Sequence, residues 1–288
     1  MREQSTQSFL ALGIAIRLDI RAHELRRVMH VNFAGFEAPP PDRQPDLHYA
    51  LERNADGWRL SRADAAGTAQ DVSSLLALLE RDLTVQLQHR RTDLLFLHAA
   101  ALVWRGSAFI LAGDSGNGKS TASWALVQDG FGYLSDELAP IRTGVGCVMP
   151  YPHAICLKGR PVGFPLPADA LDLGRTLHIP VSSFDPLKTA RETPLGAVFF
   201  VDHRTPYLAA SAVERLTVAE ASARLYVVSL NALAHPERGL DVVVDIAARI
   251  PCYALATSVL HATPALVRSV IDQDAAPRQV QAWSRGAS

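Results

Sequence analysis

The sequence is poor in cysteine, in net charge and in long apolar runs, and each shortage excludes a class of protein. Its 288 residues include three cysteines with no C-x-x-C spacing, so neither a disulfide framework nor a zinc motif is expected. Lysine and arginine (28) balance aspartate and glutamate (29), and the net charge of −1 gives no electrostatic reason to expect nucleic acid or a membrane as partner. No apolar run reaches the ~18 residues of a transmembrane helix, and the stretch 9–16 is too short for a signal peptide. We therefore expect a cytoplasmic globular protein whose cysteines are small buried apolar residues.

The chain does contain a complete phosphate-binding motif. Residues 113–120 read G-D-S-G-N-G-K-S and match the pattern G-x-x-x-x-G-K-[ST] without a mismatch. The glycines allow backbone conformations that a Cβ forbids, and these turn successive N–H groups inward toward phosphate oxygens. The lysine is expected to contact the β- and γ-phosphates, and the serine hydroxyl to bind Mg²⁺. The residues expected to bind the phosphates of ATP are Gly113, Asp114, Ser115, Gly116, Asn117, Gly118, Lys119, Ser120 and Thr121.

The segments around the motif have the order that such a loop requires. The apolar residues 107–112 predict a buried strand, and residues 121–128 predict a helix that ends at Asp129 and Gly130. The N-terminus of that helix adds a partial positive charge to the site. A chance glycine-rich turn would not require these two neighbours.

The chain is expected to divide into a small N-terminal α+β domain (1–90), a phosphate-loop domain (91–275) and a polar tail (276–288). Strands are predicted at 9–16, 48–52, 58–60, 94–97, 99–104, 107–112, 131–135, 197–201 and 252–255. Helices are predicted at 72–89, 121–128, 218–230, 240–250 and 264–272. The fold class is therefore α/β, in the wider sense of α+β with a mixed sheet.

Two acids and a histidine stand at predicted strand ends near the motif. Asp136 and Glu137, the acidic pair, follow the strand 131–135, and His98 follows the strand 94–97. In open α/β sheets, ligands bind outside the carboxyl ends of the strands. A carboxylate placed there can hold Mg²⁺ or accept the proton of an attacking hydroxyl. The structural alternatives are a helix cap or a solvated loop for the acids, and a packing role for the histidine.

Residues 97–121, together with Gly130-Phe-Gly-Tyr-Leu-Ser-Asp-Glu137, resemble the HPr kinase/phosphorylase family. The likeness is closer to the HprK-related kinases, which share a broad fold group with ATP-dependent phosphoenolpyruvate carboxykinase. It is strongest over 94–140 and continues weakly to about 272, while residues 9–25 look like the small domain of the related kinases. The resemblance implies a kinase that uses ATP and Mg²⁺ to phosphorylate a serine of a peptide or small protein. Family members are often homo-oligomers, although no segment of this sequence identifies an interface.

The resemblance also implies roles for individual residues. Lys119 and Ser120 match the family's loop lysine and Mg²⁺-binding serine, and His98 matches its histidine before the loop. The family's paired aspartates fall on Asp136 and Glu137. Asp136 is expected to bind metal, and either member of the pair is expected to be the proton acceptor, because the second position carries the longer glutamate.

The cations that correspond to further family positions are less specific. Lys158 stands near the place of a metal-binding glutamate of the family, where a cation cannot bind Mg²⁺ but can contact phosphate. Lys188 and Arg191 precede the strand 197–201 and Arg204 follows it, near an arginine of the family that stabilises phosphate charge. Each is otherwise a solvated surface cation. The family's C-terminal pattern for HPr docking and phosphorolysis is absent, which argues against both activities.

Other functions are compatible with the motif alone. A nucleotide-dependent switch or ATPase would need a residue that positions water, and the sequence marks none. A small-molecule kinase or a carboxykinase is another alternative; a carboxykinase would need extra metal ligands and an arginine-rich carboxylate site, and the sequence marks neither. A binding protein that has lost catalysis is disfavoured because the lysine, serine, histidine and acidic pair are all present. Some related kinases act on the C-terminal serine of ribosomally made peptides such as lasso-peptide precursors, but the sequence does not name the acceptor.

Overall fold

The computed structural model describes residues 5–184, 191–202, 212–256 and 260–274, and these form two compact units. Unit 1 contains the described residues up to Arg91 together with Pro152–Arg160 and Leu166–Ser183. Unit 2 contains Thr92–Tyr151, Pro161–Pro165 and the described residues from Phe184 onward. Helices and mixed sheets occur together, as the α+β prediction requires. The predicted tail, 276–288, lies outside the described residues.

Unit 1 contains a five-stranded sheet, a three-stranded sheet and two helices. Its elements are β1 (Ser5–Ala11), β2 (Ile14–Ile20), α1 (His23–Phe33), β3 (Leu47–Asn54), β4 (Gly57–Arg62), β5 (Ala65–Ala69), α2 (Val72–Arg90), β12 (Ile155–Leu157), β13 (Leu171–Asp172) and β14 (Leu177–Ile179). The strands of the larger sheet follow chain order, and the smaller sheet has the order β12-β14-β13. Strands β2 and β3 are parallel because α1 connects them, whereas the other pairs of the larger sheet are antiparallel.

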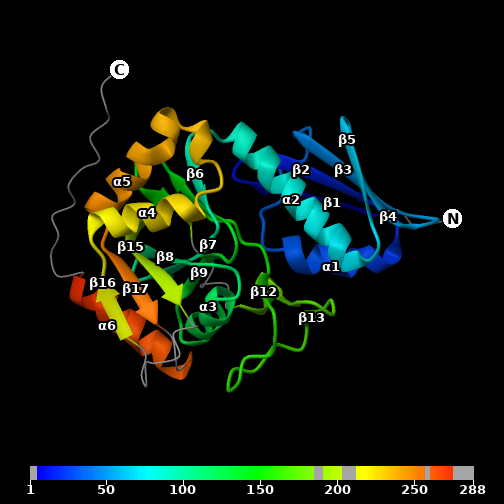
Figure 1. Ribbon diagram of the computed structural model, residues 1–288. Coiled ribbons are helices and arrows are strands. Elements are labelled where there is room, and N and C mark those ends of the chain that lie inside the picture. Colours follow the sequence, from blue (N-terminus) through cyan, green and yellow to red (C-terminus); the bar gives the residue numbers. More distant parts are fainter. Residues whose placement is uncertain (1–4, 185–190, 203–211, 257–259, 275–288) are drawn as a thin grey trace. The chain divides into compact units, whose positions relative to one another are not determined.

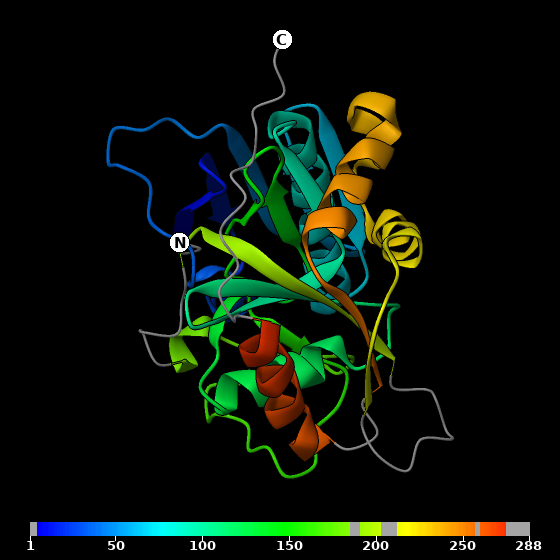
Figure 2. The same ribbon diagram turned by 90° about the vertical axis from the view of Figure 1, so that its left-hand side faces the viewer.

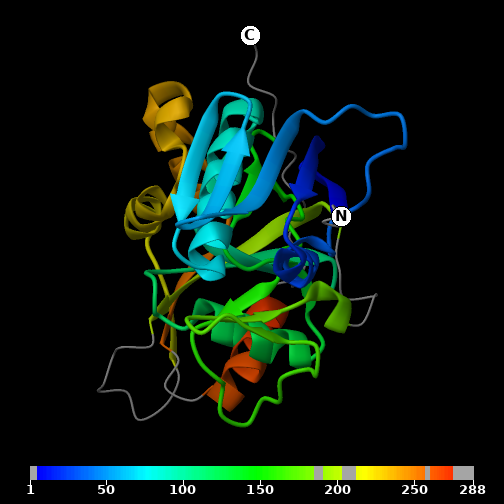
Figure 3. The same ribbon diagram turned by 90° about the vertical axis from the view of Figure 1, so that its right-hand side faces the viewer.

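Side chains of the five-stranded sheet alternate between a buried and a polar face. Leu18 and Tyr49 are fully buried on one face, and α1 and α2 pack on this sheet (Figure 3). Arg17, Asp19 and His48 form a hydrogen-bonded group on the other face. This period-two pattern is typical of a sheet that is covered on one side.

The predicted strand 9–16 is wrong, because the chain reverses within it. Leu12 and Gly13 have φ values of 53° and 83° and connect β1 to β2 as a two-residue hairpin. Two left-handed residues match the right-handed twist of paired strands. The turn lacked a sequence signal because leucine, rather than asparagine or aspartate, precedes the glycine.

A buried polar cluster links the three-stranded sheet of unit 1 to α1. The ring of His178 in β14 donates from Nδ1 to Oδ1 of Asn32 in α1, at 2.7 Å, and its Nε2 lies 2.8 Å from Oγ1 of Thr176. Sγ of Cys156 lies 3.4 Å from the same Nδ1. Burial, and then the nearby His153, lower the pKa of His178 to about 4, against a smaller opposing effect of Glu80. His178 is therefore neutral at physiological pH.

Unit 2 is built on a nine-stranded mixed sheet. Its elements are β6 (Leu94–Leu97), β7 (Ala99–Trp104), β8 (Ser107–Ala112), α3 (Lys119–Gln128), β9 (Gly132–Ser135), β10 (Ala139–Arg142), β11 (Cys147–Val148), β15 (Thr193–Asp202), β16 (Ala212–Arg215), α4 (Val218–Val228), α5 (Leu240–Arg249), β17 (Cys252–Ala256) and α6 (Thr263–Asp274). The strand order is β6-β10-β11-β15-β8-β7-β9, with β17 beside the later part of β15 and β16 beside β17. Strands β8, β15 and β17 are parallel neighbours, whereas β7 is antiparallel to both β8 and β9.

Helices cover both faces of this sheet (Figures 1 and 2). Helices α4 and α5 pack on one face, where Ile110, Val198 and Leu225 belong to a common apolar core. Helices α3 and α6 cover the other face, where the ring of Phe109 meets that of Phe131 at 5.5 Å. The central strands are therefore buried on both sides, which explains their continuous apolar runs.

The long predicted elements of both units are present. The helix predicted at 72–89 is α2, the one at 121–128 is the main part of α3, and the strand predicted at 107–112 is β8 with the same bounds. The sequence did not predict α1, β5, β10 to β14 or β16. Within the described residues, no helix combines the length and the apolar character needed to span a membrane.

The three cysteines are free thiols, as the absence of a disulfide framework predicted. Cys252 is buried, and this burial raises the pKa of its thiol to about 12. Cys147 and Cys156 are only half-buried, so the prediction of buried apolar cysteines holds for one of the three.

Candidate functional site

The phosphate loop of unit 2 connects the end of β8 to the start of α3. Gly113, Gly116 and Gly118 have φ values of 147°, 91° and 85°, all positive as the motif requires. A Cβ at Gly116 would meet no atom within 4 Å, so the space beside the loop is open there. The loop therefore has the left-handed backbone and the adjoining helix N-terminus of an anion-binding nest.

Lys119 is the first residue of α3 and is folded back over the loop. Its side chain is buried, and Nζ donates to the carbonyl oxygens of Gly113 at 2.6 Å and Asp114 at 3.2 Å. Burying an ammonium group is costly unless such acceptors satisfy it. The positive charge is thus held at the mouth of the nest, where phosphate oxygens can replace the carbonyl groups.

The loop is also fastened to β15, its parallel neighbour. Nδ2 of the buried Asn117 donates to the carbonyl oxygen of Val201 at 3.2 Å. A Cβ at Gly113 would lie 2.6 Å from the same oxygen, so only glycine allows this close approach. Both ends of the loop therefore contact the residue that precedes Asp202.

His98 reaches the loop through strand register. Ala99 at the start of β7 pairs with Ala112 at the end of β8, so His98 lies beside Gly113, the first residue of the loop. Its backbone N–H donates to the carbonyl oxygen of Val228 at 2.8 Å, and its side chain is half-buried. The histidine predicted from the sequence is therefore positioned at the phosphate-loop edge.

The acidic pair lies at the same edge, because the strands before and after it are both paired with strands next to His98. Ser135 at the end of β9 pairs with Ala101 of β7, and Ala139 at the start of β10 pairs with Leu97 of β6. The connection 136–138 consequently runs beside the connection that carries His98. Residues that are far apart in sequence are brought together here at the carboxyl ends of β8 and β9.

Burial separates the two members of the acidic pair. Asp136 is 1% exposed, whereas Glu137 is exposed. A buried carboxylate is held in one place, and an exposed one can move toward an acceptor bound at the edge. The prediction that one of these two carboxylates accepts a proton stays a prediction for both.

Of the predicted cations, Arg191 is the one that the described part of unit 2 places away from this edge. Arg191 is exposed and precedes β15, whereas the loop lies beyond the other end of that strand. Thr193 and Val201 are separated by eight residues of β15, or roughly 26 Å, so Arg191 is not brought to the loop. Lys158 is an exposed residue of unit 1. Lys188 and Arg204 lie outside the described residues.

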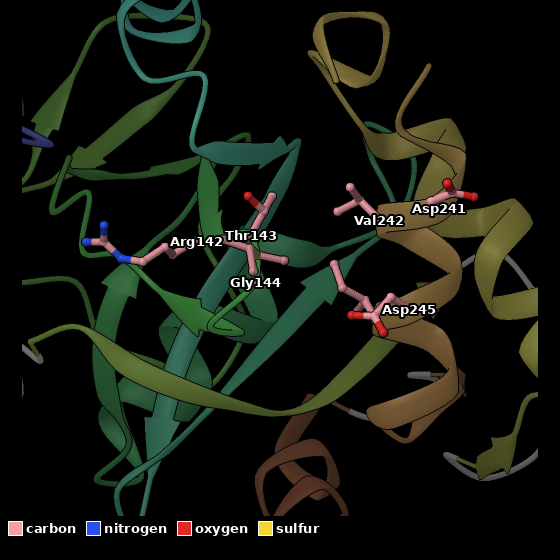
Figure 4. Close-up of a pocket in the computed structure, with 8 residues that line it drawn as sticks. Arg142, Thr143, Gly144, Asp241, Val242 and Asp245 are labelled. Carbon is pink, nitrogen blue, oxygen red and sulfur yellow. The ribbon is translucent and has the colours of Figure 1, made fainter. Parts of the chain in front are cut away.

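A pocket in unit 2 is distinct from this edge (Figure 4). It is lined by the end of β10 and its turn, Ile141–Gly144, and by Asp241, Val242, Asp245 and Ile246 of α5. The guanidinium group of Arg142 points away from α5 (Figure 4), and its Nε donates a hydrogen bond to Oε1 of Glu192. None of the residues predicted for phosphate binding or catalysis lines this pocket.

A further acid at this end of the sheet, which the sequence analysis did not single out, is Asp202. It ends the apolar strand β15, in the position that Asp136 occupies after β9, and it follows the residue that the loop contacts. The rule that placed Asp136 at a strand end would have found it as well. Only the strand order shows that β15, rather than β9, is the direct neighbour of β8.

The site has the chemical groups that ATP and Mg²⁺ require. The open nest and Lys119 fit phosphate oxygens, and Ser120 follows at the first turn of α3. The described residues contain no cluster of three or more histidine, cysteine or acidic side chains placed to hold a metal ion. Mg²⁺ usually binds one or two carboxylates and takes its other ligands from phosphate and water, and Ser120 and the acids of this edge are residues of the kind that would hold it.

Comparisons with known proteins add little to this geometry. The sequence matches no protein-family model and no curated protein. Among solved structures, the Hpr(Ser) kinase/phosphatase from Coxiella burnetii is similar, with 12% identity over 62% of this chain and 94% of the other, and a TM-score of 0.31. A likeness at this TM-score shows neither the fold nor the function of this chain.

Proposed function

We propose that this protein is an ATP-dependent kinase that transfers the γ-phosphate to a hydroxyl group, in the first place a serine of a peptide or small protein. The observation that carries the proposal is the convergence of the phosphate loop, His98 and the acidic pair at one edge of the unit 2 sheet. A loop without these partners would support nucleotide binding alone. The serine acceptor comes from the sequence resemblance to HprK-related kinases.

In the proposed reaction, the residues of the edge divide the work. The backbone N–H groups of the loop and Lys119 hold the β- and γ-phosphates of ATP. Asp136 or Glu137 accepts the proton of the acceptor hydroxyl. The hydroxyl oxygen forms a bond to the γ-phosphorus, the bond from the γ-phosphorus to the β–γ bridging oxygen breaks, and ADP is released. Mg²⁺, when bound, offsets charge on the phosphates. His98 orients an acid or contacts the phosphate.

Replacing Lys119 tests the proposal. Lys119→Ala is expected to lower the rate of transfer from [γ-³²P]ATP to a serine-peptide library by roughly 10²-fold or more, because the charge that offsets the transferred phosphate is lost. Far-ultraviolet circular dichroism should be unchanged. Near-normal transfer in this variant would overturn the scheme.

Variants of the acidic pair test the mechanism. The transfer rates of Asp136→Asn and Glu137→Gln are each to be measured, and full activity in both would remove the acidic pair from the mechanism.

A hydrolysis assay separates the proposed kinase from a switch or ATPase. Rapid ATP hydrolysis by the wild type without acceptor would favour a switch or ATPase. Lys158→Ala asks separately whether that lysine contacts phosphate.

A further inference from the structure

Asp202 lies on a strand next to β8, whereas Asp136 follows a strand that is two places away from β8. Strand β15 is the direct parallel neighbour of β8, whereas β7 lies between β8 and β9. Neighbouring strands are about 4.8 Å apart, so Asp202 is displaced from the loop strand by about 5 Å and Asp136 by about 10 Å. Asp202 is therefore the acid one strand away from β8, the strand that leads into the loop.

Register also places Asp202 level with the loop. Phe200 pairs with Ala112, the last residue of β8, so Asp202 extends two residues beyond that pair, into the level of the loop. On its other side, Asp202 pairs with Ala256 of β17. Its backbone is thus held between neighbours, while its side chain is exposed at the carboxyl end of the sheet.

The loop and the strand that carries Asp202 are physically joined. The carbonyl oxygen of Val201 accepts a hydrogen bond from the side-chain amide of Asn117, and Gly113 lies close to the same oxygen. These contacts fix the carboxylate-bearing residue relative to the nest before any ligand binds. An acid at the end of an apolar strand beside a phosphate loop is the arrangement that holds Mg²⁺ in many nucleotide-hydrolysing enzymes.

We propose that Asp202 and Ser120 hold the Mg²⁺ of the ATP complex, and that the acidic pair on the β9 side is used for proton transfer. This assignment rests on the proposed nucleotide-dependent function and revises the expectation that Asp136 binds the metal. The two carboxylate positions then lie on opposite sides of β8. One side of the loop serves the phosphates and metal, and the other serves the acceptor hydroxyl.

The test measures ATP binding with and without Mg²⁺, by titration calorimetry, in wild type, Asp202→Asn and Asp136→Asn. With EDTA, Asp202→Asn should bind ATP as tightly as wild type or more tightly, because a negative charge near the phosphates is removed. The tightening that Mg²⁺ produces should fall by about tenfold in Asp202→Asn and persist in Asp136→Asn. Mn²⁺ bound with ADP, followed by electron paramagnetic resonance, should show the same order.

Two further variants accompany the test, and different outcomes would overturn the metal assignment alone or the kinase function as well. Asp241→Asn changes an exposed acid at the start of α5 and should behave as wild type, and Asp202→Ala should reproduce Asp202→Asn. If Asp202→Asn keeps the wild-type effect of Mg²⁺, or Asp136→Asn loses it instead, the metal assignment is overturned while the proposed kinase function stands. If the wild type binds no ATP, both are overturned.

Discussion

At the scale of single residues, the glycines of the loop are needed for different reasons. Gly116 and Gly118 have φ values near 90°, where any Cβ is strained. Gly113 has φ of 147° and, in addition, faces the carbonyl oxygen of Val201 at a distance that no Cβ tolerates. The sequence motif predicts the first requirement, but only the neighbouring strand explains the second.

This difference gives a stability prediction. Gly113→Ala is expected to lower the free energy of unfolding by about 3 kcal/mol or more, because backbone strain is added to a collision with backbone. Gly106→Ala is the matched control, since Gly106 also has positive φ (78°) but an added Cβ would meet no atom within 4 Å. The control should cost about 1–2 kcal/mol in urea unfolding. Equal losses in the two variants would contradict the close approach to β15.

The grouping of the other site residues depends on strand register, which the sequence does not record. The sequence shows that His98 and the acidic pair stand at strand ends, and the structure places those ends at one edge. It does not show which acid is nearer to the loop, because that depends on the antiparallel β7 lying between β8 and β9. The strand-end rule could have marked Asp202 in the sequence, but only the strand order shows that its strand is the direct neighbour of β8.

At the scale of elements, the strand before His98 is held by the segment that follows α4. Asn231 is buried; its Oδ1 accepts the N–H of Phe96 at 2.8 Å, and its Nδ2 donates to the carbonyl oxygen of Leu94 at 2.9 Å. One side chain thus provides the pair of backbone contacts that a further strand would otherwise provide. Asn231 thus supports β6 beside the backbone hydrogen bond from His98 to Val228.

Removing this side chain should loosen the edge. Asn231→Ala is expected to lower the free energy of unfolding by about 2–4 kcal/mol, since the N–H of the buried Phe96 loses its acceptor. Asn54→Ala, at an exposed position at the end of β3, is the control and should change it by about 0.5 kcal/mol or less. Chemical denaturation measures both, and a loss in Asn231→Ala no larger than in the control would refute the bracing role.

Long periodic elements were predictable, and short ones were not. Helices α2 and α5 have enough turns for their apolar spacing to be recognised in the sequence. Strands β11 and β13 have two residues each and carry no periodicity at all. Strand β11 pairs with the distant β15 and β13 pairs with the nearby β14, so pairing rather than apolar periodicity defines both strands.

At the scale of the whole molecule, acid sensitivity is expected from particular groups rather than from overall repulsion. The net charge of −1 leaves little repulsion at neutral pH. His178 is buried among polar partners from α1 and the three-stranded sheet, and its pKa is about 4 instead of 6.5. The folded state therefore resists the proton that the unfolded chain accepts.

The sign of the effect follows from this difference. Between pH 6.5 and about 4 the unfolded state binds more protons at this site, so the free energy of unfolding falls as the pH falls, by about 3 kcal/mol in total. Urea unfolding at pH 7 and pH 4.5 should show a smaller fall in His178→Gln than in wild type. The exposed His30→Gln, in α1, is the control and should keep the wild-type fall. If the free energy of unfolding of His178→Gln falls between these pH values as much as that of wild type, the burial of a neutral imidazole is contradicted.

The discontinuous make-up of unit 1 has a consequence for how the chain is made. A ribosome that has finished Arg91 has delivered the five-stranded sheet and both helices of the unit, but not β12 to β14. At ~5–20 residues per second, about 5 to 20 seconds pass before β14 emerges and His178 can meet Asn32. During this interval the nascent unit lacks one of its sheets, while the first strands of unit 2 are already leaving the tunnel. Co-translational folding of this protein therefore cannot proceed as one unit completed before the next begins.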